Sequence, residues 1–256
     1  METVTHDGRT TAYRTSTRGD GRRILCVHGS GGTHQIWRAQ LGRLAAGRTV
    51  AALDLSGHGD SADVDVPPED AIDAYVDDVA AVADAVDADV LIGNSLGGAV
   101  VLSGCLDGRL DPEGAVLVGS GARLAVGQPL REWLAHDFDR AVDFLHEPDR
   151  LFHDPDPRLT DASRAAMRDA GRATVERDFL ACHNFDARDR LPGLDVPLLA
   201  LTGDHDTLTP PRFSEYLADH VDRGEWTTLP DAAHLAFLET PDAFNREVDA
   251  FLAALD

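Results

Sequence analysis

Short, continuous apolar runs alternate along the chain with segments whose apolar residues recur at helical spacing. The runs lie at residues 23–29, 49–57, 90–92, 114–122, 196–204 and 225–231, and the main helical segments at 33–46, 69–86, 211–221 and 241–255. Two alternating segments at the start of the chain flank Asp7-Gly8, a hairpin signal. Apolar runs bounded by turns are typical of strands buried on both faces. The pattern predicts an α/β fold, a mostly parallel central sheet flanked by helices.

The region 123–194 breaks this alternation, because it contains helical patterns and no strand pattern. Such an insertion is expected over the edge of the sheet where ligands of open α/β folds bind. We therefore expect a core domain of residues 1–122 and 195–256, and a helical cap of residues 123–194 that encloses a substrate pocket. The cap residues expected to line this pocket are Trp133, Phe138, Leu145 and Phe179.

The chain is strongly acidic, with 45 Asp and Glu against 23 basic residues and a net charge of −22. All of the basic residues are Arg, and Asp outnumbers Glu by 35 to 10. This balance argues against partners such as nucleic acid or an anionic membrane surface, because both require a basic face. The acid is spread along the chain, which resembles the composition of cytoplasmic proteins from salt-accumulating archaea, where concentrated salt screens self-repulsion.

Targeting and cysteine patterns predict a cytoplasmic protein. The start of the chain lacks the basic and apolar regions of a secretory signal, and no apolar run reaches membrane-spanning length. Cys26, Cys105 and Cys182 are odd in number and widely spaced, which argues against a disulfide framework and against a zinc motif. The sequence gives no indication of oligomeric state.

The stretch GNSLGG, residues 93–98, separates an apolar run from a segment of small residues with helical character. It contains Gly93-x-Ser95-x-Gly97, a serine with glycines two residues away on each side. A sharp strand-to-helix corner strains its central residue and needs small neighbours. The pattern predicts a nucleophile elbow that holds the Ser95 hydroxyl out at the edge of the sheet.

A serine nucleophile needs a histidine base, and that base needs an acid that holds its tautomer. In this fold class the chain order is Ser, acid, His. Asp204 and Asp206 follow the apolar run 196–204, and His234 stands in a loop before the last helix. His205 competes for the role of base, but it lies between the two candidate acids. The expected triad is Ser95, His234 and one of these two aspartates.

An oxyanion hole requires two backbone N–H groups that point at the developing negative charge. One is expected from Leu96, the residue after the nucleophile. The glycine-rich stretch HGSGG, residues 28–32, follows an earlier strand and can supply the other. We assign the second donor to Ser30, with Gly29 and Gly31 as alternatives.

These motifs resemble the α/β-hydrolase fold family, in the form that carries a helical cap. The resemblance includes HGSGG, DLSGHGDS (54–61), GNSLGG, GDHD and AAHLAFLETP, which together span residues 27 to 241. It implies that Asp206 is the acid, three residues after the glycine that ends its strand, and that Asp54 and His58 support a structural turn. Haloalkane dehalogenases and epoxide hydrolases of this fold carry an aspartate at the elbow, where this chain has Ser95.

The resemblance implies a serine hydrolase that cleaves a small ester or lactone through an acyl-enzyme, without a metal or organic cofactor. Carbon–carbon bond hydrolases, thioesterases and cofactor-free haloperoxidases use the same triad, and a non-catalytic small-molecule receptor is an alternative from another class. No basic cluster indicates an anionic substrate, although Arg123 or Arg188 could reach one.

Overall fold

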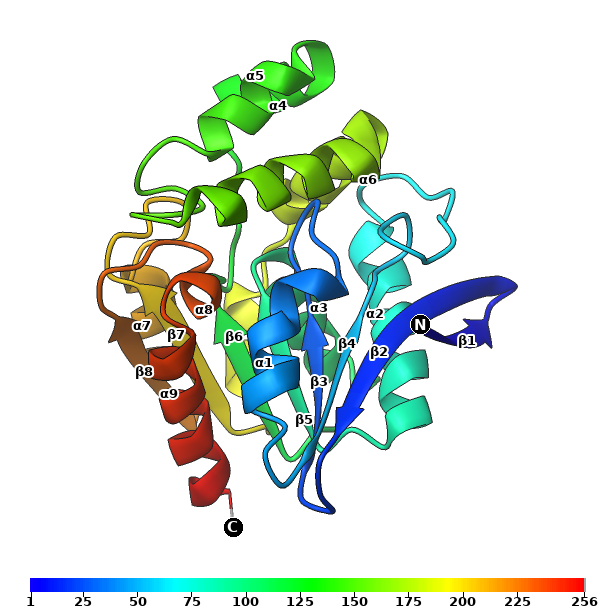
Figure 1. Cartoon of the computed structure of the whole chain (residues 1–256), viewed down its shortest axis with the longest axis vertical. Coiled ribbons are helices and arrows are strands. Elements are labelled where there is room, and N and C mark those ends of the chain that lie inside the picture. Colours follow the sequence, from blue (N-terminus) through cyan, green and yellow to red (C-terminus); the bar gives the residue numbers. More distant parts are fainter. Residues whose placement is uncertain (256) are drawn as a thin grey trace.

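The computed structural model describes residues 1–255 and contains one eight-stranded sheet (Figure 1). In spatial order the strands are β1 (Glu2–His6), β2 (Arg9–Thr17), β4 (Thr49–Leu53), β3 (Arg23–Val27), β5 (Val90–Asn94), β6 (Gly114–Val118), β7 (Leu198–Gly203) and β8 (Gly224–Leu229). The pairs β1–β2 and β2–β4 are antiparallel, and every other pair is parallel. The predicted mostly parallel sheet is therefore confirmed.

The hairpin between β1 and β2 forms at the predicted dipeptide. Asp7 and Gly8 have φ angles of 46° and 76°, so both central residues are left-handed. That conformation is the one a two-residue turn needs to match the twist of the flanking strands. The register pairs His6 with Arg9 on either side of the turn.

Helices cover both faces of the sheet. Successive strand residues point to opposite sides, and here the residues on both sides are apolar and must be buried. Leu25 and Val27 of β3 join a core with α2 (Ala71–Val86) and α3 (Leu96–Leu106), whereas Ile24 and Cys26 join a second core with α1 (Arg38–Arg43) and α9 (Pro241–Ala254). The helices that surround the core strands are η1 (His34–Trp37), α1 (Arg38–Arg43), α2 (Ala71–Val86), α3 (Leu96–Leu106), α7 (Arg212–His220), α8 (Ala236–Glu239) and α9 (Pro241–Ala254). The doubly covered sheet explains the near-continuous apolar strands.

The segment between β6 and β7 is helical, as its sequence predicted. It contains α4 (Gln128–His136), α5 (Phe138–Leu145), α6 (Pro157–Asn184) and η2 (Arg188–Gly193). Helix α6 is interrupted at Gly171, whose φ of 82° and ψ of 159° are not helical. Helices α4 to α6 lie above the carboxyl ends of the parallel strands (Figure 1). The division into core and cap remains a prediction that this arrangement supports.

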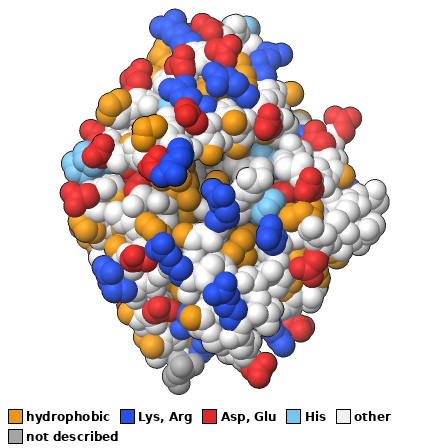
Figure 2. Space-filling view, in the orientation of Figure 1, with side chains coloured by type: hydrophobic (Ala, Val, Ile, Leu, Met, Phe, Trp, Pro, Cys, Tyr) orange, Lys and Arg blue, Asp and Glu red, His pale blue; other side chains and the backbone are white. Residues whose placement is uncertain are grey.

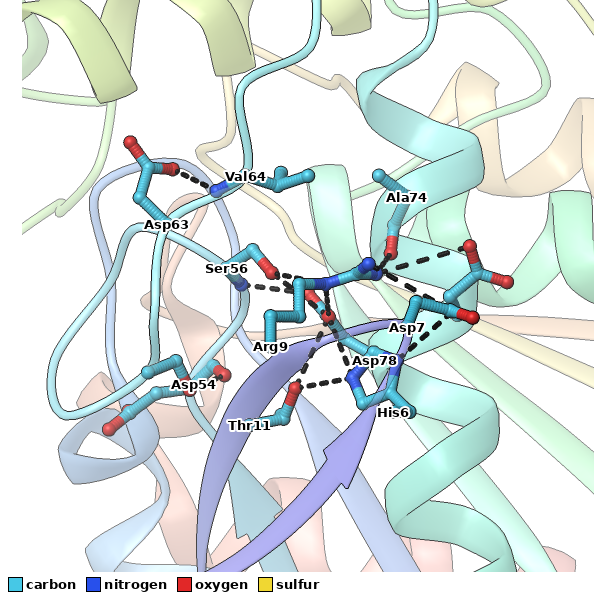
Figure 3. Close-up of polar contacts among 12 residues, drawn as sticks. His6, Asp7, Arg9, Thr11, Asp54, Ser56, Asp63, Val64, Ala74 and Asp78 are labelled. Carbon is cyan, nitrogen blue, oxygen red and sulfur yellow. Dashed lines mark hydrogen bonds and ion pairs between the residues drawn. The ribbon is translucent and has the colours of Figure 1, made fainter.

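A buried carboxylate ties the amino-terminal hairpin to the core (Figure 3). Asp78 of α2 is fully buried and accepts hydrogen bonds from Arg9 Nε at 3.0 Å and Thr11 Oγ1 at 3.2 Å. The backbone N–H of Ser56, in the loop after β4, donates to its other oxygen at 2.8 Å. Three segments distant in sequence thus meet at one charge, which is costly to bury unless it is paired in this way.

Acidic side chains are distributed over the visible face of the molecule, with arginines between them (Figure 2). Several exposed pairs connect distant segments, among them Arg43 with Asp242 and Arg168 with Asp139 at 3.2 Å. Exposed pairs of this kind contribute only about 0–1 kcal/mol each. Pairing does not change the net charge of −22, so repulsion between the remaining surface carboxylates persists. No helix among residues 1–255 is long and apolar enough to cross a membrane.

We expect the melting temperature to rise steeply from dilute buffer to molar KCl. The screening length falls from about 30 Å at 0.01 M salt to about 3 Å at 1 M, which removes most repulsion between surface carboxylates. Thermal unfolding over a KCl series, followed by circular dichroism, measures this dependence. A flat dependence would contradict the halophilic interpretation and leave the active-site assignment untouched.

Candidate active site

Ser95 occupies the corner between β5 and α3 in a strained conformation. Its φ of 53° and ψ of −115° lie outside the regions that L-residues favour. The flanking glycines permit this corner. A Cβ on Gly97 would lie 2.5 Å from the carbonyl oxygens of Val27 and His28, and one on Gly93 would overlap the backbone of Gly97. The strand–corner–helix geometry predicted from the sequence is therefore present.

Asp206 and His234 come from loops after neighbouring strands. Asp206 follows β7, and His234 lies between β8 and α8. Nδ1 of His234 is 2.9 Å from Oδ2 of Asp206, and both side chains are almost fully buried. Burial alone would raise the pKa of Asp206, but His234 and hydrogen bonds from Thr209 lower it below its usual value. The carboxylate is thus ionised beside the imidazole.

Thr209 is a residue of this site that the sequence analysis missed. Its hydroxyl lies 2.6 Å from Oδ2 of Asp206 and 3.0 Å from Nδ1 of His234. The backbone N–H groups of Leu208 and Thr209 both donate to Oδ1 of Asp206 at 2.8 Å. An aspartate followed at the third position by threonine is typical of a turn that the carboxylate caps, so the stretch DTLT carried this signal.

The two competing residues of the same loop point elsewhere. The Asp204 side chain is 43% exposed and lies 3.5 Å from the backbone nitrogen of Ala232. His205 stacks on His153, with ring centroids 3.6 Å apart. The structure therefore brings Asp206, and not Asp204 or His205, to His234.

The glycine-rich loop after β3 approaches Ser95 closely. A Cβ on Gly29 would lie 2.9 Å from Oδ1 of Asn94 and 3.0 Å from Cβ of Ser95, so a larger residue there would have to displace these neighbours. The N–H of Gly31 donates to Oδ2 of Asp178 at 3.3 Å. Among residues 1–255, no hydrogen bond engages the backbone N–H of Ser30 or of Leu96. This pattern disfavours Gly31 as an oxyanion donor and leaves Ser30 and Gly29 as candidates beside Leu96, so the assignment of Ser30 stays a prediction.

Asp178 of α6 is a fully buried carboxylate that anchors this loop. It lies 3.0 Å from Nε2 of His58 and accepts a hydrogen bond from the hydroxyl of Tyr75 at 2.6 Å. Burial opposes both charges, yet the attraction between them raises the pKa of His58 and lowers that of Asp178. His58 therefore has the structural role that its motif implied, and the pair connects α6 to the glycine-rich loop.

Asp54 likewise supports its turn. It accepts hydrogen bonds from the backbone N–H of His34 at 2.7 Å and of Asp60 at 3.1 Å, and Nδ1 of His34 lies 2.9 Å from it. It is fully buried and does not line the cavity described next.

A cavity of about 440 Å³ opens in front of Ser95 and His234. Such a volume is typical of small-molecule sites. Its lining is mostly apolar and includes no Asp, Glu or Arg among the described residues. Trp133 and Phe179, both predicted to line the pocket, do so. Other lining residues come from the loop after β6 and from the helices above the sheet: Leu124, Val126, Leu130, Phe144, Met167 and Cys182.

Phe138 and Leu145 do not line this cavity. Leu145 is fully buried in the core beside Ala141 and Val142, and Phe138 packs against the same core. Helix α5 is amphipathic and contributes Phe144 to the cavity lining, whereas Leu145 is used for packing between helices. These two predictions are therefore not supported by the structure.

The two arginines considered for an anionic substrate are engaged elsewhere. Arg123 lies 3.6 Å from a carboxylate oxygen of Asp186, and Arg188 lies 2.6 Å from the same oxygen. Neither lines the cavity. The cavity thus offers Ser95 and His234 at one corner of a lining that is otherwise mostly apolar.

Comparisons with known proteins agree with this geometry. A family model described as the alpha/beta hydrolase family matches residues 24–247. The pimeloyl-[acyl-carrier protein] methyl ester esterase of Neisseria meningitidis serogroup C is 32% identical over 242 residues, which cover 87% of this chain and 90% of that protein. The enol-lactonase from Burkholderia xenovorans LB400 shares the fold, with a TM-score of 0.88 at 23% identity, over 98% of this chain and 100% of that one.

A thermophilic esterase of known structure is 27% identical, has a TM-score of 0.84, and matches 99% of this chain and 97% of its own. The predicted fold and enzyme class are thereby confirmed. The chain belongs to the alpha/beta hydrolase family, as a hydrolase of the esterase type.

Proposed function

We propose that the protein is a serine hydrolase that cleaves a small, uncharged ester or lactone. The observation that carries the proposal is the buried Asp206–His234 pair, whose histidine lines the same cavity as the strained Ser95. A carboxylate and an imidazole that serve a hydroxyl facing a cavity are the groups that activate a serine nucleophile.

In the proposed mechanism, the Ser95 hydroxyl attacks the carbonyl carbon while Nε2 of His234 accepts its proton. Asp206 holds Nδ1 of His234, which fixes the tautomer and stabilises the imidazolium that forms. The N–H groups of Ser30 and Leu96 stabilise the oxyanion, and His234 then returns the proton to the leaving alcohol. A water molecule, activated in the same way, hydrolyses the acyl-enzyme.

The cavity lining favours a substrate whose acyl group is apolar and uncharged. Its lining includes no Asp, Glu or Arg among residues 1–255, so a buried carboxylate or ammonium on the substrate would remain unpaired at high cost. The relative from Neisseria acts on a methyl ester carried by a protein. For this chain we propose only the shared chemistry, an ester bond, with the acyl chain in the cavity.

A panel of p-nitrophenyl esters from acetate to laurate, assayed in molar KCl, tests the proposal. We expect kcat/KM to peak at an intermediate acyl length. The acyl chain gains apolar contacts until it fills the cavity, and a longer chain no longer fits. A simple lactone should also be hydrolysed. Turnover of thioesters or of carbon–carbon bonds in preference to every ester would favour those alternatives, and saturable binding without any turnover would favour a receptor.

Replacing Trp133 or Phe179 by alanine is expected to shift the preferred acyl length upwards. Both side chains line the cavity and are only partly buried, so their removal enlarges the chamber more than it weakens the core. Removing an apolar contact changes the relative kcat/KM between neighbouring acyl lengths by about 10- to 200-fold. Phe138→Ala is the matched control, because this aromatic residue lies outside the lining. Marked unfolding without a change of preference would make Trp133 and Phe179 core residues.

A further inference from the structure

Two histidines and a carboxylate meet beside the active site, outside the cavity. The ligand atoms of Asp149, His153 and His205 all lie within 4.8 Å of one another. Asp149 and His153 belong to the loop between α5 and α6, and His205 follows β7. Oδ1 of Asp149 is 2.6 Å from Nδ1 of His153 and 3.7 Å from Nδ1 of His205. Both imidazoles therefore present the same nitrogen to one carboxylate.

We propose that Asp149, His153 and His205 form a binding site for one divalent transition metal ion of the zinc class. Two imidazole nitrogens and one carboxylate oxygen, with a fourth position left to water, are a donor set that suits Zn²⁺ and its neighbours better than Mg²⁺ or Ca²⁺. A tetrahedral zinc site places its ligand atoms about 3.4 Å apart. The distances of 2.6 and 3.7 Å bracket that value.

The side chains can adjust to an ion and are open to it. They are 29% exposed for His153, 40% for His205 and 42% for Asp149. The two rings stack at a centroid distance of 3.6 Å and an interplanar angle of 14°. Binding would require the rings to turn so that both lone pairs face one point, which partly exposed side chains can do. A further carboxylate, Asp204, lies 3.8 Å from Nε2 of His205 and adds negative charge that favours a cation.

The position of the site suggests what an ion would do there. Backbone carbonyls of Asp149, Arg150 and Leu151 accept hydrogen bonds from the N–H groups of Thr207, His234 and Leu235, at 3.0, 3.1 and 2.9 Å respectively. The loop that carries two of the metal ligands thus holds the segments that contain Asp206 and His234. An ion bound to His205 and to this loop would clamp them together.

Binding is tested by isothermal titration of the untagged, chelator-treated chain with ZnCl₂. We expect one Zn²⁺ per chain, at least ten-fold weaker binding in the His153→Ala/His205→Ala double variant, and unchanged binding in His220→Ala. His220 is a matched control, since it is an exposed histidine that stacks on Tyr216 and is not part of the cluster. Excess Mg²⁺ should not compete. Equal binding by the double variant, or no binding by the wild type, would overturn the proposal.

The clamp has a separate readout in amide hydrogen exchange. Saturating Zn²⁺ should slow exchange at the amides of Thr207, His234 and Leu235 in the wild type and leave the double variant unchanged. The melting temperature should rise by about 5 °C at an ion concentration of about 100 times the Kd. Exchange that slows equally in both proteins would contradict the clamp. None of these measurements depends on turnover, so they stand or fall independently of the proposed function.

Discussion

Replacing Ser95 by alanine is expected to lower kcat by about 10⁶-fold on any ester that the wild type accepts. Loss of the nucleophile removes the acyl-enzyme route altogether, since the imidazole then has no hydroxyl to deprotonate. The backbone at this corner already has a φ of 53°, and alanine adopts it with the same strain as serine. The variant should therefore fold normally, which its melting temperature will check.

Ser103→Ala is the matched control, because Ser103 lies on α3, the helix that follows Ser95, and does not line the cavity. It should retain kcat within a few-fold of the wild type. A Ser95→Ala variant that keeps substantial turnover would exclude an acyl-enzyme on this residue.

Replacing Asp206 by asparagine is expected to lower kcat by about 10⁴-fold, equivalent to about 5 kcal/mol of transition-state stabilisation. The amide keeps the shape of the side chain but cannot stabilise an imidazolium at Nδ1 of His234, 2.9 Å away. Its amide group can also favour the wrong tautomer of the imidazole. Measurement of kcat on one ester is sufficient.

Asp204→Asn provides the comparison for Asp206→Asn, because Asp204 lies two residues earlier in the same loop with an exposed side chain. It should change kcat only slightly. A larger loss in Asp204→Asn than in Asp206→Asn would transfer the role of acid, and small losses in both variants would mean that this loop supplies none.

The strands, the elbow and the order of Ser95, Asp206 and His234 could be predicted because each has a local signal. Buried strands appear as apolar runs, and a corner that excludes side chains appears as flanking glycines. The choice between Asp204 and Asp206 depended on family resemblance, because the turn signal in the stretch DTLT was not used. The structure separates them by the turn that Thr209 and Asp206 form together.

Contacts between segments that are distant in sequence could not be predicted from sequence patterns. Amphipathicity identifies Leu145 and Phe179 equally as apolar cap residues, but only packing decides that the first is core and the second faces the cavity. The pair of Asp178 and His58 joins positions 120 residues apart. Such contacts depend on how α6 lies over the sheet, which no local pattern records.

Labelling with a fluorophosphonate probe tests the central claim most directly, because this reagent modifies only a serine activated by a neighbouring base. Wild-type protein in molar KCl should be labelled stoichiometrically, with the adduct on the peptide that contains Ser95. Labelling should disappear in Ser95→Ala and be strongly slowed in Asp206→Asn. An unlabelled wild-type protein that is folded, or an adduct on a different residue, would contradict the account.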